Sequence, residues 1–355
     1  MIIEDLLKEL VEKKGSDLHI SNGLPPVFRI DGELIRSEMA PLTSEGVENL
    51  LFPMLSNEQR RRLEQEWELD FSYGVEGIGR FRVNFYKDKG SYAAAFRTIA
   101  AVAPRLEDLK MPPIVTTIAE RPRGLCLVTG PTGSGKSTTL AAMIDYINRT
   151  RAEHILTIED PVEFVHQSKM SVIHQRELGM DTRSFANALK SALREDPDII
   201  LVGEMRDHET IALALTAAET GHLVFGTLHT SSASQTIDRI IDVFPEGQQQ
   251  QIRVQLASSL IAVFAQTLLP KREPDGSQKG RIMAQEILVV TPAVSNLIRE
   301  AKAAQIYSTI QTSSSFGMQT LEASLAELYK KGLINLDDAL AKTSKPAELK
   351  RLIQG

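Results

Sequence analysis

Nine consecutive residues near the middle of the chain have the types and spacing of a loop that binds phosphate. Glycines in this pattern let successive backbone N–H groups turn inward around phosphate oxygens, a lysine neutralises the outer phosphates, and the next hydroxyl holds Mg²⁺. A strand-like apolar run, 125–128, precedes the loop and a helix-forming run, 138–144, follows it, as the motif requires. We predict that ATP and Mg²⁺ bind here, with Ser137 at the metal and the nucleotide held by Gly130, Pro131, Thr132, Gly133, Ser134, Gly135, Lys136, Ser137 and Thr138.

The candidate for activating the attacking water is Glu204, which follows the apolar run 199–202. Strand ends are where α/β sheets place their ligands. A Mg²⁺-binding aspartate is usual at the end of such a strand beside a phosphate loop, but Gly203 occupies that place here. The departure leaves Glu204 to polarise the water or to hold the metal through water.

A second acidic group follows the predicted strand 154–158 and contains Glu159, Asp160 and Glu163. We expect these carboxylates to assist Glu204. Glu159 and Asp160 would help to bind the nucleotide, and Glu163 would take part in catalysis. For Glu159 or Asp160 alone, the alternative is the capping of a helix N-terminus.

Two histidines flank the predicted strand 223–227. His229 follows the strand, where a side chain can project toward the phosphate loop and sense the γ-phosphate through a hydrogen bond. His222 precedes the strand and follows Gly221, so it is also open to a structural interpretation as a partner of a helix end.

Arginines lie on predicted strands of the first hundred residues, among alternating aromatic and aliphatic residues. Alternation puts Arg80 and Arg82 on one face of their strand, and Arg97 lies on the next strand. One interpretation is a solvated face of a sheet. The other is that these side chains reach a nucleotide bound by a neighbouring domain or subunit, as arginine fingers do.

The length of 355 residues favours two domains. Residues 1–100 predict an α+β domain with an antiparallel sheet, in which one helix spans about 44–66 and an Asp31-Gly32 turn closes a hairpin. A proline-rich segment, 101–113, predicts an interdomain linker. Residues 114–355 alternate apolar strands with helices, which predicts a mostly parallel α/β sheet, and from about 248 onward we expect helices interrupted by a polar surface loop at 271–280.

The composition of the chain argues against several classes of protein. The net charge of −6 argues against a broad basic face for nucleic acid. The single cysteine, Cys126, lies within an apolar strand, so neither a disulfide nor a zinc framework is available. The N-terminus is unlike a secretory signal and no run reaches about 18 apolar residues, so we expect a cytoplasmic protein.

Taken together, the motifs resemble those of the secretion-superfamily ATPases, and above all the type IV pilus retraction (PilT or twitching-motility) family. The resemblance covers essentially the full length. It rests on the phosphate loop and on the ordered segments 71–86, 155–164, 196–207 and 221–230, with further matches at 16–20 and 318–321.

This resemblance implies a PAS-like N-terminal domain and a RecA-like P-loop ATPase domain with a largely helical C-terminal part. It also implies a homohexamer at the cytoplasmic face of the inner membrane, associated with the membrane only through partners. The partner would be the pilus platform protein, with no stable binding of nucleic acid. By the same resemblance Glu204 is the catalytic glutamate, residues 159–163 form an acidic box, His222 and His229 a histidine box, and Arg82 and Arg97 the arginine fingers.

Several alternatives stay open. Pilus-assembly and type II secretion ATPases belong to the same superfamily but are longer and usually carry a four-cysteine zinc element, which this chain lacks. A RecA-like DNA translocase shares the phosphate loop, although the acidic charge argues against it. The third alternative is a regulatory protein that binds ATP as a switch and does not hydrolyse it to do mechanical work. Within the retraction family's usual Ala-Ile-Arg-Asn-Leu-Ile signature, Ser295 stands where arginine is expected, so coupling to the pilus base can differ here.

Overall fold

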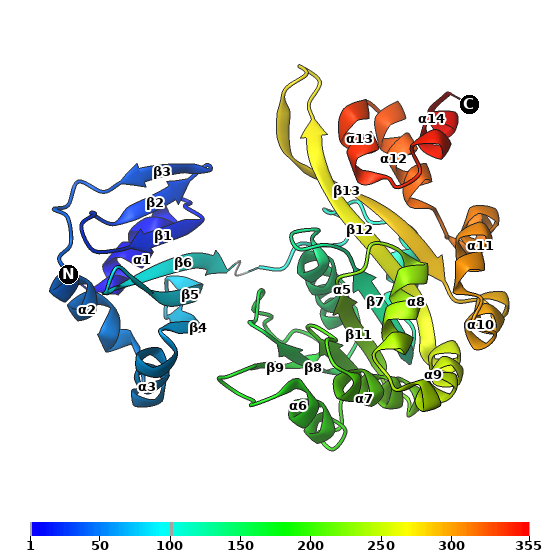
Figure 1. Cartoon of the computed structure of the whole chain (residues 1–355), viewed down its shortest axis with the longest axis horizontal. Coiled ribbons are helices and arrows are strands. Elements are labelled where there is room, and N and C mark those ends of the chain that lie inside the picture. Colours follow the sequence, from blue (N-terminus) through cyan, green and yellow to red (C-terminus); the bar gives the residue numbers. More distant parts are fainter. Residues whose placement is uncertain (1, 100–101, 355) are drawn as a thin grey trace. The chain divides into compact units, whose positions relative to one another are not determined.

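The structure, a computed structural model, describes residues 2–99 and 102–354 (Figure 1). The chain separates into two compact units. Unit 1 comprises the chain up to Val102 together with Pro161–Val165, and unit 2 comprises Ala103–Asp160 and the chain from His166 onward. The predicted linker, 101–113, begins at a residue outside the described part, and from Ala103 on it lies in unit 2, where Leu106 is buried in the core. The predicted domain boundaries stay predictions.

Unit 1 is an α+β fold in which every strand pairing is antiparallel, in the order β3-β2-β1-β6-β5-β4. Apolar residues of the helices and of alternate strand positions, such as Phe81 and Phe85, form one core. The elements are α1 (Ile3–Glu12), β1 (Asp17–Ile20), β2 (Val27–Ile30), β3 (Glu33–Arg36), α2 (Ser44–Leu51), α3 (Asn57–Glu66), β4 (Glu68–Val75), β5 (Gly79–Asp88) and β6 (Ser91–Ile99).

Two local predictions in unit 1 had different outcomes. The Asp31-Gly32 hairpin is confirmed, because both residues have positive φ and Ile30 pairs with Glu33 across the turn. The single helix predicted over 44–66 is wrong. Pro53 lies in a short 3₁₀ turn after α2, and Ser56 then caps α3 by accepting a hydrogen bond from the backbone of Gln59, so the segment forms two helices.

Unit 2 is built on a sheet of order β13-β12-β7-β11-β10-β8-β9, in which β12 and β13 pair antiparallel and all the other pairs are parallel. Strands β7, β10 and β11 are buried at every position, as expected of a parallel sheet covered on both faces. The elements up to β11 are α4 (Pro113–Ala119), β7 (Gly124–Thr129), α5 (Lys136–Thr150), β8 (His154–Glu159), β9 (Val172–Glu177), α6 (Phe185–Ala192), β10 (Ile199–Val202), α7 (His208–Glu219) and β11 (Leu223–Leu228).

The C-terminal part is less helical than predicted. After α8 (Ala233–Asp242) and α9 (Glu246–Ser259), the chain forms a long hairpin of β12 (Leu260–Arg272) and β13 (Gln278–Val289), which extends the sheet beyond β7 (Figure 1). The polar loop at its tip is confirmed, whereas the strands beside it were missed because a continuous apolar run does not distinguish a buried strand from a buried helix. The remaining helices are α10 (Pro292–Arg299), α11 (Ile306–Thr312), α12 (Leu321–Lys330), α13 (Leu336–Lys342) and α14 (Pro346–Gln354).

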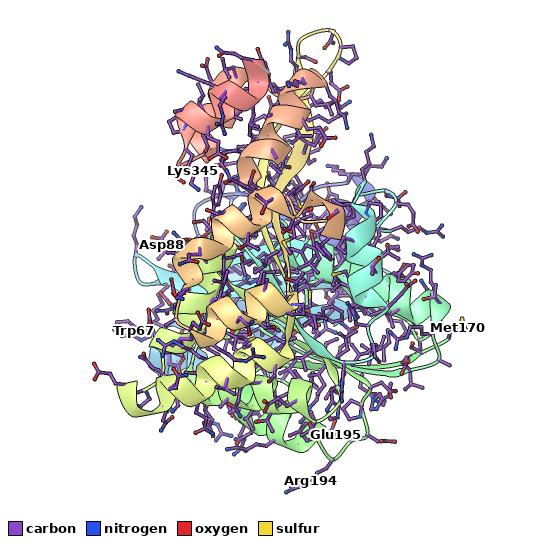
Figure 2. All side chains as sticks on the ribbon, turned by 90° about the vertical axis from the view of Figure 1, so that its right-hand side faces the viewer. Trp67, Asp88, Met170, Arg194, Glu195 and Lys345 are labelled. Carbon is purple, nitrogen blue, oxygen red and sulfur yellow. The ribbon has the colours of Figure 1, made fainter. Side chains whose placement is uncertain are left out.

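A separate small core lies under the C-terminal helices, where Leu325, Ile334 and Leu349 pack against Leu269 of the hairpin. Near it the Lys345 ammonium lies over the ring of Tyr307 (Lys345 is labelled in Figure 2). Across the described part of the chain, no helix is both long and apolar enough to cross a membrane. The predicted fold class, an α+β unit followed by a P-loop α/β unit, is confirmed.

Candidate nucleotide site

The phosphate loop connects β7 to α5, and its glycines adopt backbone conformations that other residues avoid. Gly130, Gly133 and Gly135 have φ values of 143°, 76° and 89°. A Cβ on Gly130 would also collide with the backbone carbonyl of Gln266 and the hydroxyl of Ser134. Glycine is therefore required both for the turn and for the close approach of the loop to β12.

The lysine of the loop folds back over the loop itself. Lys136 Nζ donates to the carbonyl oxygens of Gly130, at 2.9 Å, and Pro131, at 3.2 Å. The buried hydroxyls of Ser134 and Thr129 have no hydrogen-bond partner among the described residues. A cation at the centre of a glycine cradle at the N-terminus of α5 is a suitable receptor for the phosphates of a nucleotide.

The register of the sheet brings the predicted catalytic residues to the same edge as this loop. Neighbouring parallel strands β8, β10, β11 and β7 end next to one another, since Ile158 pairs with Val202, Val202 with Gly226, and Leu228 with Thr129. Residues that directly follow these strands, Glu204 and His229 among them, therefore gather beside the phosphate loop.

Glu204 is held between two cationic or potentially cationic side chains. Its Oε2 lies 2.6 Å from an Arg206 guanidinium nitrogen, and its Oε1 lies 3.2 Å from His229 Nε2. Burial alone would raise the pKa of this carboxyl, but the hydrogen bond and charge of Arg206, with a contribution from His229, outweigh burial and hold the pKa below its usual value. Glu204 is thus ionised at neutral pH and paired, with its side chain 22% exposed.

Two glycines and a methionine explain how the chain presents Glu204. A Cβ on Gly203 would lie 3.1 Å from Glu159 Cα, so a side chain at the position where an aspartate was expected would crowd the backbone of β8. The next residue but one, Met205, is buried against Gly226, and its backbone N–H donates to the carbonyl of Thr227. This anchor turns the flanking side chains of Glu204 and Arg206 outward.

Of the acidic group, Glu159 and Asp160 lie at the same edge of the sheet. Glu159 Oε1 accepts hydrogen bonds from the Thr157 hydroxyl, at 2.6 Å, and from Gln175 Nε2, at 3.2 Å. The charge of Asp160 contributes to the raised pKa of Arg206, after the larger effects of Glu204 and burial. No helix forms between β8 and β9, so the alternative role of these two acids as helix caps is wrong.

The other predicted catalytic residues belong to unit 1. Glu163 is exposed and lies in the segment Pro161–Val165, which clusters with unit 1. Arg82 and Arg97 are directly opposite each other on β5 and β6, and Arg97 pairs with Asp17 at 2.9 Å. None of the described residues hydrogen-bonds or ion-pairs with Arg82. These three residues therefore lie in a different unit from the phosphate loop, and their predicted roles stay predictions.

His222 is not brought to the loop within one chain. It precedes Leu223, which pairs with the first residue of β7, so it lies at the opposite end of the strand from His229, roughly 20 Å away at about 3.3 Å per residue. Its Nδ1 contacts the carbonyl of Ala217 at 2.9 Å, near the end of α7. This contact confirms the structural interpretation as a helix-end partner, and the predicted role in nucleotide binding stays a prediction.

Comparison with known proteins agrees with this site. The model of the family described as type II/IV secretion system protein matches residues 1–340. The chain belongs to this family. It is 53% identical to the type IV pilus retraction ATPase PilT of Pseudomonas aeruginosa, across 98% of this chain and 99% of that one, and 56% identical to a twitching motility protein of Neisseria gonorrhoeae, across 87% and 82%. The crystal structure of the pilus retraction motor PilT with bound ADP matches with a TM-score of 0.91 and 49% identity, covering 99% of both chains.

In this member of the type II/IV secretion family, the site also includes residues that sequence reasoning missed. A cavity of about 740 Å³ adjoins the N-terminus of α5. Its lining comes from α5 (Thr138, Thr139), the segment before α4 (Met111), the β12–β13 hairpin (Leu268, Arg281) and α12 (Ser324). Thr138 was predicted from the phosphate-loop motif. The other residues come from four distant parts of the chain and share no motif, so no signal in the sequence marked them. A smaller cavity, about 420 Å³, lies beside Pro131 and His229 and is bordered by Asp238 and Arg239 of α8.

Proposed function

We propose that this chain is an ATP-hydrolysing motor that powers type IV pilus retraction. The observation that carries the proposal is the gathering of Glu204, His229 and a glycine-rich phosphate loop at one sheet edge, in a chain similar to PilT over nearly the whole length of both proteins. The similarity to a PilT crystal structure with bound ADP supports a nucleotide as the ligand of this loop.

The phosphate loop has the groups to bind the phosphates. Its backbone N–H groups and the Lys136 ammonium would contact the phosphate oxygens, after Lys136 exchanges the carbonyls of Gly130 and Pro131 for them. The Ser137 hydroxyl would hold Mg²⁺, with Glu204 acting through water, and the ion would neutralise charge on the outer phosphates.

Glu204 is suited to orient the attacking water rather than to act as a strong base. Its lowered pKa keeps it ionised, so it accepts a hydrogen bond from water, but the same low pKa weakens its ability to take up a proton. Its pairing with Arg206 and His229 restrains the carboxylate in one position. His229 would then contact the γ-phosphate from the neighbouring strand end.

The cavity of about 740 Å³ is proposed to receive the base and ribose. It begins at Thr138 and Thr139, beyond the part of the loop that faces the outer phosphates, and its volume lies within the range of sites for ligands of this size. Leu268 and Met111 offer apolar contact, and Arg281 offers a planar cation that can stack on a base.

Arg82 and Arg97 are proposed as arginine fingers that act on a nucleotide held by a neighbouring subunit of a homohexamer. One row across the sheet of unit 1 contains Arg29, Asp17, Arg97 and Arg82. Asp17 pairs with Arg97 and lies 3.8 Å from Arg29, which leaves Arg82 directly beside another guanidinium without a counter-ion among the described residues. Like charges directly opposite each other are destabilising, so this row is ready to accept an anion.

In the cell, we propose that the ring works in the cytoplasm at the inner membrane, against the platform protein of the pilus, without stable binding of nucleic acid. Closure and release of successive subunits on ATP binding and hydrolysis would move the platform and draw pilin subunits back into the membrane.

The direct test is ATP turnover by the purified chain. We expect Glu204→Gln to bind ATP as the wild type does but to hydrolyse it about 10² to 10⁴ times more slowly. The matched control is Glu209→Gln, which changes an exposed glutamate paired with Lys190 on the same unit. We expect this control to turn over ATP at the wild-type rate. A Glu204→Gln variant that keeps more than about a tenth of the wild-type rate would exclude the assigned role.

A further inference from the structure

A buried amide side chain of β12 hydrogen-bonds to the phosphate loop, and it belongs to none of the motifs found in the sequence. Gln266 of β12 is 3% exposed. Its Nε2 donates to the backbone carbonyl of Ser134 at 3.0 Å, and its Oε1 accepts from the Thr139 hydroxyl at 3.0 Å. One side chain thus joins the loop to the first turn of the helix that follows it, across more than a hundred residues of sequence.

The orientation of this amide is determined by its partners. A backbone carbonyl can only accept a hydrogen bond, so the donor nitrogen of Gln266 must face Ser134 and the oxygen must face Thr139. Gln285, directly opposite on β13, also points Nε2 at this oxygen, at 3.4 Å. An apolar side chain could fill the same space without the cost of burying an amide. We therefore infer that the hydrogen bond donated by Gln266 Nε2 has a role of its own.

The consequence lies in the next peptide group. In a trans peptide the carbonyl and the following N–H point in opposite directions. Because Gln266 holds the Ser134 carbonyl against β12, the N–H of Gly135 points away from β12, toward the open side of the loop. Gly135 has a positive φ of 89° and no Cβ to restrain it, so its peptide can rotate unless something fixes the carbonyl.

We propose that Gln266 is a positioning residue for nucleotide binding: it fixes the Ser134–Gly135 peptide so that the Gly135 N–H is presented to the phosphates. The inference rests on the proposed binding of a nucleotide at this loop. By this inference β12 contributes a residue to the site that the phosphate-loop motif does not include.

The first test replaces the amide with a side chain of similar size. Gln266→Leu loses both hydrogen bonds, and we expect its Kd for a fluorescent ADP analogue and its KM for ATP to rise about tenfold, with kcat within threefold of the wild type. A separation of KM from kcat follows because the N–H contacts the phosphates in both the ground state and the transition state. The control is Thr267→Val on the opposite face of the same strand, expected to bind the ADP analogue as the wild type does.

The second test uses a readout that a purely structural role would not affect. In Gln266→Glu the protonated carboxyl can still donate to the Ser134 carbonyl, whereas the ionised carboxylate cannot. Its affinity for the ADP analogue, divided by that of the wild type at the same pH, should therefore fall as pH rises, while the same ratio for Gln266→Leu stays constant. Should Gln266→Leu not fold, the pH dependence of the Gln266→Glu affinity relative to the wild type decides the matter.

The outcomes separate this inference from the proposed function. A wild-type chain that does not bind the ADP analogue contradicts the function itself. Wild-type binding together with a folded Gln266→Leu that binds equally well, or a Gln266→Glu whose relative affinity is independent of pH, overturns the positioning role and leaves the function intact.

Discussion

At the scale of residues, the site depends on an ion pair beside the catalytic candidate. Glu204 is partly buried, and burial disfavours its charge, but Arg206 and His229 restore the charged form. The Arg206 side chain is itself 70% exposed. An exposed arginine can move away from Glu204 when a nucleotide arrives, and the pKa of Glu204 would then rise toward the value that burial favours.

This pairing predicts a change in the pH profile. Without the guanidinium, in Arg206→Gln, burial dominates and the pKa of Glu204 rises, so the carboxyl becomes protonated at higher pH. We expect the acidic limb of kcat/KM to move to higher pH, with the plateau little changed. Measurement of kcat/KM from pH 4 to 9 for both proteins tests it. An acidic limb that stays in place or moves to lower pH would contradict the assignment.

At the scale of elements, strand β13 supports both sides of the site. Consecutive side chains of a strand point to opposite faces. Gln285 therefore faces Gln266 and the phosphate loop, while Glu286 faces α8, where its Oε1 accepts from the backbone N–H of Ala233 at 2.7 Å. Since α8 begins shortly after His229, this carboxylate fixes the far end of the loop that carries the histidine.

Glu286 gives a prediction of stability. Replacement by leucine leaves the Ala233 N–H buried without its partner, so we expect Glu286→Leu to lose about 1–3 kcal/mol of unfolding free energy in urea.

Burial raises the pKa of Glu286 in the fold, with a further contribution from Glu322, so wild-type stability falls as pH rises from the unfolded pKa to the folded one. Glu286→Gln has no such titration, and its stability relative to wild type should increase from pH 4 to pH 7. A constant difference would refute the linkage.

Elements also show what the sequence could and could not predict. The phosphate loop, Glu204 and His229 were found because each directly follows a short buried strand, and parallel strands end at a common edge. The strands β12 and β13 were taken for helix, so Gln266 and Arg281 could not be placed near the loop. Their contribution depends on the pairing of β12 with β7, which local patterns do not encode.

At the scale of the whole molecule, the residues that the family resemblance assigns to the nucleotide site are divided between the two units of the chain. Arg82 and Arg97 lie in unit 1, whereas the phosphate loop, Glu204 and His229 lie in unit 2. If these arginines act between subunits, a chain without its own fingers can still hydrolyse ATP beside a neighbour that has them.

Mixed rings test this prediction. Arg82→Ala and Lys136→Ala should each be nearly inactive alone, because one lacks the finger and the other the phosphate lysine. Equal mixing restores an intact pair at roughly a quarter of the interfaces, so ATP turnover should recover in the mixture. Lys87→Ala on the same strand is the control and should stay active by itself. A mixture as inactive as its components would rule out action between subunits.

The claim that ATP hydrolysis at Glu204 drives retraction is tested most directly by counting surface pili in the native host. The strain to use carries Glu204→Gln as its only copy, beside wild type and a Glu209→Gln strain. We predict more surface pili and loss of twitching in the Glu204→Gln strain alone, because assembly would continue while retraction stops. Cells without pili, or cells with unchanged pili and normal twitching, would contradict a retraction motor that depends on this glutamate.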